Sequence, residues 1–245
     1  MNTLLRGGVA ALLLVSTPLV TFAFGPRQGS DPTSDAMGKL ANIFARKAFS
    51  ATAVMTTPGG ASGRGMNMEF AMFMSGGKTR VEMDMAKMMG ATGGAGMPPG
   101  MDKIINITIP AKKVIYQIIP GMKGYYEMPI PDGTASAPGA EAKVVRKSQG
   151  VDTVEGYVCE KMLTTITSAD GTKTEITTWE AKALNGIPVK TEIPTSDGKM
   201  TMLYKDIKTS KPADSLFEVP AGLKKYGSMQ ELMMSGMMQM IPQSP

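Results

Sequence analysis

The feature that most constrains the fold of this chain is a series of short segments in which apolar and polar side chains alternate with a period of two. A period of two places successive side chains on opposite faces of a β-strand. The segment Lys78 to Met85 shows it clearly, with Val81 and Met83 on one face and Arg80 and Glu82 on the other. The predicted strands cover residues 49–56, 66–74, 78–85, 103–109, 113–119, 124–128, 142–148, 157–167, 173–181, 187–193 and 199–208.

Short turns join these segments, which favours antiparallel pairing between consecutive strands. Gly76-Gly77, Ala169-Asp170-Gly171 and Ser196-Asp197-Gly198 are turn sequences of this kind. A helix is predicted before the strands, over residues 34–48, with Ser34 or Asp35 as its N-cap. The predicted fold class is therefore mainly β (α+β), an antiparallel meander curved into an incomplete barrel with a covering N-terminal helix.

The N-terminus has the pattern of a cleavable signal peptide. Arg6 precedes an apolar run from Val9 to Val20, which is short for a membrane-spanning helix, and small residues follow with a cleavage position near Ala23. The predicted organisation is a signal peptide over 1–23, a flexible tether over 24–33, one domain over 34–226 and a Met-rich tail over 227–245. We expect a periplasmic protein that is not membrane-spanning. Because no cysteine follows the cleavage position, we also expect that it carries no lipid anchor.

Composition removes several classes of function. The chain has no histidine and one cysteine, so serine triads, Cys–His pairs and most zinc sites lack their central group. Glu82 and Asp84 share a strand face with Arg80 and are interpreted as a solvated face with local charge pairing. The formal net charge of +5 is scattered along the chain, which does not suit a nucleic-acid binder. We therefore predict no catalytic residues, no metal and no cofactor.

Methionine is the most unusual component, with 24 residues concentrated in two regions. The first region predicts one apolar sheet face, formed by Met66, Met68, Phe70, Met72, Met74, Val81, Met83 and Met85. Three interpretations stay open for it. Methionine fills irregular gaps in a packed core, it lines adaptable sites for flexible apolar ligands, and its thioether binds Cu(I).

The second methionine region is the C-terminal tail. Met229, Leu232, Met233, Met237 and Met240 fall on one stripe if the tail is helical. No Lys or Arg occurs after Met229, so the tail lacks the basic flank of a helix that seeks membrane surfaces. We expect the tail to dock on its own domain or on an envelope protein partner.

Several motifs of the chain resemble a known family. They are Lys78-Thr79-Arg80-Val81-Glu82-Met83, Gly156-Tyr157-Val158-Cys159-Glu160-Lys161, Thr178-Trp179-Glu180-Ala181, Ile187-Pro188-Val189-Lys190 and Ser215-Leu216-Phe217-Glu218-Val219-Pro220-Ala221-Gly222-Leu223-Lys224-Lys225. In this order they resemble an uncharacterised exported bacterial branch of the superfamily of the lipoprotein carriers LolA and LolB. The resemblance implies a half-barrel with a helical lid around a hydrophobic cavity that accepts acyl chains. No residue specific to lipoprotein transport matches.

Two functional hypotheses follow from the sequence. The first is a periplasmic binding or carrier module for a hydrophobic, lipid-like ligand such as an acyl chain. The alternative is a non-catalytic structural or interaction domain of the envelope with a packed core. Cu(I) binding by methionine is a third hypothesis.

Overall fold

The computed structural model describes residues 47–58, 66–87, 100–130, 143–167, 171, 173–195 and 198–240. These residues belong to one compact unit, Asp31–Pro245. The predicted signal peptide, the tether and residues 34–46 of the predicted N-terminal helix lie outside the described residues. Lys47 and Ala48, the last two residues of that predicted helix, are described and are not helical.

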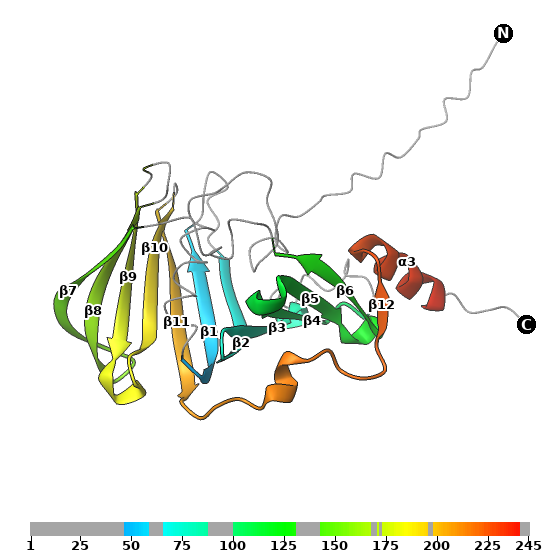
Figure 1. Ribbon diagram of the computed structural model, residues 1–245, viewed down its shortest axis with the longest axis horizontal. Helices are drawn as coiled ribbons and strands as arrows, with labels where there is room; N and C mark the ends of the chain where they lie inside the picture. The colour runs from blue at the N-terminus through cyan, green and yellow to red at the C-terminus, as the bar shows by residue number, and fades with distance from the viewer. Residues whose placement is uncertain are drawn as a thin grey trace, which may run out of the picture. The chain divides into compact units, whose positions relative to one another are not determined.

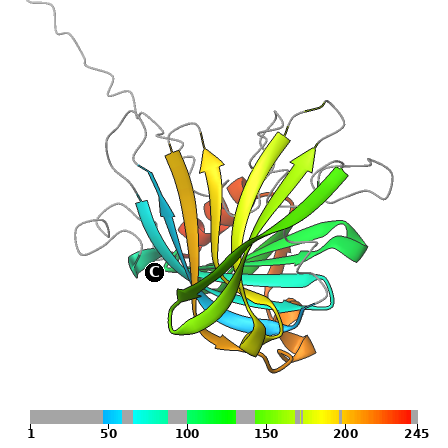
Figure 2. The same cartoon turned by 90° about the vertical axis from the view of Figure 1, so that its left-hand side faces the viewer.

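The prediction of a mainly β fold is confirmed, and the strands join in one sheet of twelve (Figure 1). Its strands are β1 (Phe49–Thr57), β2 (Met66–Ser75), β3 (Lys78–Asp84), β4 (Lys103–Ile109), β5 (Val114–Ile119), β6 (Gly124–Pro129), β7 (Lys143–Val154), β8 (Tyr157–Thr167), β9 (Lys173–Ala181), β10 (Ile187–Thr195), β11 (Gly198–Lys208) and β12 (Lys224–Tyr226). The sheet is curved and is not closed into a barrel (Figure 2).

The strand order corrects the prediction of one continuous meander. The order is β12-β6-β5-β4-β3-β2-β1-β11-β10-β9-β8-β7, so two antiparallel meanders, β1–β6 and β7–β11, meet where β1 pairs with β11. The sheet is also mixed, because β12 pairs with β6 in parallel. Alternation along a strand identifies the strand but carries no information on which distant strand lies beside it.

Three connections between strands use the same tight turn. The turns are the short 3₁₀ helices η3 (Pro110–Lys112), η4 (Pro120–Met122) and η5 (Lys182–Leu184), each followed by one residue in the left-handed conformation. The backbone N–H of Lys113 donates to the carbonyl of Pro110 at 2.9 Å, and Lys123 repeats this bond with Pro120. In η3 and η4 the proline presets the backbone for the turn, which fixes the hairpin register.

The two faces of the sheet carry separate cores. We call the face that carries Met68 and Met55 the inner face. The larger cluster of buried apolar residues draws on β1, β2 and β8 to β11, and most of its side chains lie on this face. The opposite, outer face carries a second cluster, which contains Ile105, Ile107, Ile118 and Phe217. The described strands therefore pack apolar side chains on both sides of β4 and β5.

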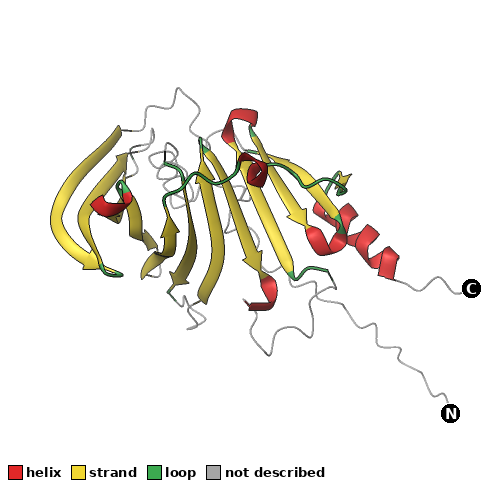
Figure 3. Ribbon diagram, turned by 90° about the horizontal axis from the view of Figure 1, so that it is seen from below, coloured by secondary structure: helices red, strands yellow, loops and turns green. Residues whose placement is uncertain are grey.

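The outer cluster is covered by the segment that follows β11. This segment contains η6 (Asp214–Phe217), which contacts β3 and β4, and it leads on to β12 (Figure 3). Phe217 is buried, and the guanidinium of Arg80 donates to the carbonyl oxygen of Leu216 at 2.8 Å. The pairing of Arg80 with Glu82 agrees with the sequence interpretation, but that face is covered and Arg80 is buried, so it is not a solvated face. Burial opposes ionisation of Glu82, yet hydrogen bonds from Lys103 and Arg80 keep its pKa below the ordinary value.

The described tail forms α3 (Met229–Met240), which contacts η4, β6 and β12. Ser228 Oγ accepts the backbone N–H of Glu231 at 3.2 Å, while the Glu231 carboxylate accepts the N–H of Gly227 at 2.7 Å. This reciprocal pattern is a variant of the capping box, and it starts the helix. Among the described residues, none of the helices has the length and apolar character needed to cross a bilayer.

Candidate ligand-binding face

The predicted methionine face lies on β2 and β3. The register pairs Met72 with Val81 and Phe70 with Met83, and directly paired residues point to the same side of a sheet. Met68 and Met74 share this side by alternation along β2. Met66 belongs to β2, and its side chain lies outside the described residues. Met85 follows the end of β3, where its backbone N–H donates to the backbone carbonyl oxygen of Asp102 at 2.8 Å.

Burial is uneven across this face. Met68, Met74, Val81 and Met83 are buried, whereas Phe70 and Met72 are only half-buried although both pack against the larger core cluster. The half-buried pair occupies the middle of β2. Apolar atoms at this point are therefore available for contact with another apolar molecule.

The same inner face continues over strands that the site prediction did not include. One row of directly paired residues runs from β2 through β1, β11 and β10 to β9, and it consists of Met68, Met55, Met202, Thr191 and Thr178. The row changes from methionine to threonine between β11 and β10. This row becomes polar toward β9, while Ile193 on β10 and Ile176 on β9 keep the neighbouring positions of the inner face apolar.

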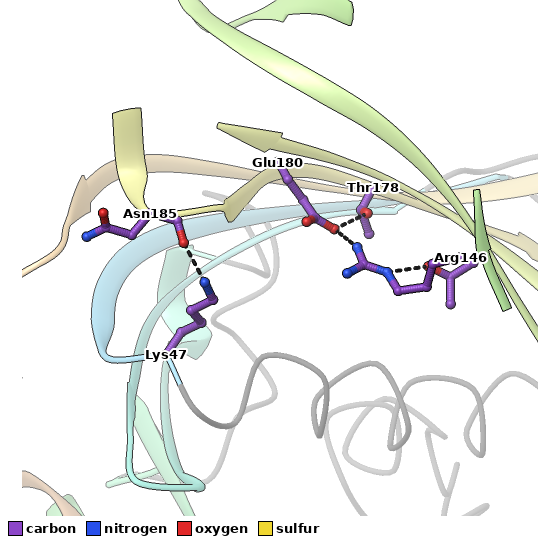
Figure 4. A network of polar contacts seen from close by, with 6 residues as sticks. Lys47, Arg146, Thr178, Glu180 and Asn185 are labelled. Carbon is purple, nitrogen blue, oxygen red and sulfur yellow. Dashed lines mark hydrogen bonds and ion pairs between the residues drawn. The ribbon is translucent and has the colours of Figure 1, made fainter. Parts of the chain in front are cut away.

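The polar end of this face contains an Arg–Glu ion pair (Figure 4). Arg146 on β7 pairs with Glu180 on β9, and its Nε donates to Thr164 Oγ1 on β8 at 3.4 Å. The hydroxyl of Thr178 donates to the same Glu180 oxygen at 2.8 Å. The side chains of Arg146 and Glu180 are 33% and 15% exposed, so Glu180 is half-buried and Arg146, an exposed residue, is reachable.

We call Arg146, Thr164, Thr178, Glu180 and Thr191 the polar row. Thr164, Thr178 and Thr191 are buried. The Thr191 hydroxyl makes no hydrogen bond of acceptable geometry among the described residues, although Tyr204 lies close to it. The row combines a cation, an anion and hydroxyl groups at one end of an otherwise apolar face.

The inner face carries a second polar group at β4–β6, and its side chains are buried and hydrogen-bonded to one another. Gln117 donates to Asn106 Oδ1 at 3.0 Å and accepts a hydrogen bond from the Tyr126 hydroxyl. All three side chains are buried, and burial raises the pKa of Tyr126. Fully paired buried groups of this kind fix the packing of a sheet.

The motif around Trp179 divides between the two faces. Thr178 and Glu180 belong to the polar row, whereas Trp179 lies on the outer face between the ammonium groups of Lys161 and Lys190, at 5.2 and 4.4 Å from the ring centre. Its indole N–H donates to Asp152 at 3.0 Å. The tryptophan is buried, and both its ring and its indole N–H have partners, which is typical of a residue with a structural role.

The described residues contain no group of three His, Cys, Asp or Glu side chains that could hold a metal ion. Cys159 is buried, and burial raises the pKa of its thiol, which makes the reactive thiolate scarce near neutral pH. This face offers contact with apolar groups next to a charged, hydroxyl-rich end.

Comparison with known proteins gives fold-level likeness only. No protein-family profile matches the chain, and no curated protein matches it. Among solved structures, a LolA superfamily protein from Nitrosomonas europaea has 10% identity and a TM-score of 0.35, covering 76% of this chain and 98% of that one. The Mycobacterium tuberculosis lipoprotein LppX has 14% identity and a TM-score of 0.40, covering 76% of this chain and 100% of that one. LprF from Mycobacterium bovis has 14% identity and a TM-score of 0.36, covering 75% and 97%. LolA superfamily proteins are thus among the structural neighbours, as the sequence motifs predicted.

Proposed function

We propose that this protein is an exported, non-catalytic binding or carrier module that holds a hydrophobic, lipid-like ligand against the inner face of its sheet. The observation that carries the proposal is the half-buried pair Phe70 and Met72 beside the buried side chains Met68, Met74, Val81 and Met83 of the methionine face. Burying an acyl chain against such a surface gains about 0.8 kcal/mol per CH₂ group. Methionine suits this task because its unbranched side chain adapts to a flexible ligand.

The compartment is part of the proposal. The signal-peptide pattern at 1–23 directs export, and the predicted cleavage near Ala23 releases the domain into the periplasm. A hydrophobic ligand that crosses this aqueous space needs a protein surface that shields it from water.

The test measures ligand binding directly. Native mass spectrometry of protein purified gently from the periplasm is expected to show bound lipid, and the delipidated protein is expected to bind a fluorescent fatty acid. Met72→Gln places an unpaired amide in the ligand's path, so the probe should bind roughly 5- to 100-fold more weakly. The matched control is Ala71→Gln, which puts the same side chain on the outer face of β2 and should leave binding unchanged.

The alternative predicts a different result. An interaction domain of the envelope is favoured by Met234, which is 58% exposed on α3, a helix that contacts β6, β12 and η4. Protein that carries no lipid and fails to bind the probe would overturn the carrier proposal. Capture of an envelope partner that is lost on Met234→Glu would then support the alternative.

A further inference from the structure

We propose that Arg146 binds the anionic head of the ligand, a phosphate or a carboxylate, while the apolar part lies along the inner face toward Met202 and Met55. This inference rests on the proposed function and names the chemistry of its ligand. It starts from the polar row, which occupies the same face of the sheet as Met68 and Met55.

The separation of the two regions suits one amphipathic molecule. Four strand spacings lie between Met68 on β2 and Thr178 on β9, which corresponds to about 19 Å along the sheet. One acyl chain occupies half of the roughly 30 Å hydrocarbon core of a bilayer, or about 15 Å. A single chain that starts at the polar row on β9 therefore spans about three strand spacings and reaches Met202 on β11 and Met55 on β1.

Arg146 has donors left for a ligand. A guanidinium carries five N–H donors, and among the described residues Nε serves Thr164 and Nη2 serves Glu180. Nη1 has no hydrogen-bond partner in the described part of the chain. Because the planar fork matches phosphate and carboxylate oxygens, the unused edge is suited to an anionic group.

Glu180 acts as a positioning residue for Arg146. Its carboxylate holds Nη2, and it is itself held by the hydroxyl of Thr178. This contact orients the guanidinium on the exposed edge strand β7.

The buried hydroxyl of Thr191 provides an independent observation beside Thr178. Thr191 is paired directly with Thr178 across β9 and β10, and its buried hydroxyl has no hydrogen bond of acceptable geometry among the described residues. A buried hydroxyl without a partner costs stability, so such groups usually serve a ligand or an ordered water. Thr191 lies one strand from Thr178 on the same face, so the proposed head-group site extends to β10.

The test compares three probes with the same chain: dodecanol, dodecanoate and dodecyl phosphate, each titrated against the delipidated full-length protein. The wild-type protein should bind the two anions at least roughly tenfold more tightly than the alcohol. Arg146→Gln should remove this preference and leave dodecanol binding unchanged. The control Lys147→Gln removes the adjacent cation, which alternation places on the outer face, and should change nothing.

Glu180→Gln provides a second variant that keeps an acceptor for Arg146 but removes its charge, and it should tighten anion binding without changing dodecanol binding. The ratio of the affinities for the anionic probes and for dodecanol is measured on the wild-type protein. It therefore remains decisive if Arg146→Gln does not fold. Equal affinity for all three probes would overturn the head-group site and leave the proposed function standing. Absence of binding by all three would overturn both. A stronger response to dodecyl phosphate than to dodecanoate, or the reverse, identifies the head group.

Discussion

At the scale of single residues, Tyr204 on the inner face makes the stability of the fold depend on pH. Its ring packs edge-on against Phe49 at a centroid distance of 6.4 Å, and burial raises the pKa of Tyr204 to about 12 from 10.0. A raised pKa favours the neutral phenol in the folded state. The stability that results is fully present below pH 10 and is lost as the pH rises toward 12.

We therefore predict that Tyr204→Phe flattens the alkaline limb of the stability curve. The wild-type protein should lose up to about 2 to 3 kcal/mol of unfolding free energy from this group between pH 9.5 and 12. The variant should lack this part of the loss, while the other tyrosines and lysines contribute equally to both proteins. Urea titrations at several pH values measure the difference. Parallel pH curves for the two proteins would contradict the prediction.

At the scale of elements, α3 is held by a few contacts at β6. Leu232 is fully buried, and a Cβ added at Gly124 would lie 2.6 Å from the Tyr226 ring and 3.2 Å from Leu232 Cδ1. Only glycine at this position of β6 lets the helix side approach so closely. The Tyr226 hydroxyl also hydrogen-bonds Ser235 Oγ at 2.9 Å, so β12 and α3 are anchored together.

These contacts predict that the tail is part of the stable domain. Leu232→Ala should cost about 2 to 5 kcal/mol of unfolding free energy, because it leaves a cavity against β6. Met234→Ala, a control on the exposed side of the same helix, should stay within about 0.5 kcal/mol of the wild type. Urea unfolding followed by circular dichroism measures both. Equal, small effects would mean that α3 does not contribute to the fold.

The same elements show what the sequence could predict. The predicted ranges of strands such as Lys103–Ile109 and Lys173–Ala181 match the observed ones, and the first of these is an apolar run that ends at Pro110. The three-residue strand β12 is too short to show a period. The polar row was missed because Arg146 and Glu180 come from separate strands, and a lone charge on a strand is usually interpreted as solvent-facing. In the Thr-rich β8 and β9, the facing of Thr164 and Thr178 is set by register, which the sequence does not reveal.

At the scale of the whole molecule, the pairing of β1 with β11 decides whether the two meanders behave as one body. Among the described strands the meanders pair along this ladder, from Ser50↔Lys208 to Thr56↔Thr201. The paired residues are far apart in the sequence, so this contact forms against a large loop-closure cost. The inner core nevertheless crosses the ladder, since Met55 and Met202 are buried in the same cluster.

We predict that the ladder couples the meanders into one cooperative unit, and native-state hydrogen exchange tests this. Amides of β1 and β11 should exchange only through global unfolding, with one common opening free energy, whereas the amides of the exposed edge strand β7 should exchange far more easily. Leu232→Ala perturbs only the β6 end of the sheet. If the coupling holds, the opening free energy at β11 falls by the same amount as at β1, although β11 belongs to the other meander. A fall at β1 with none at β11 would show two meanders that unfold independently.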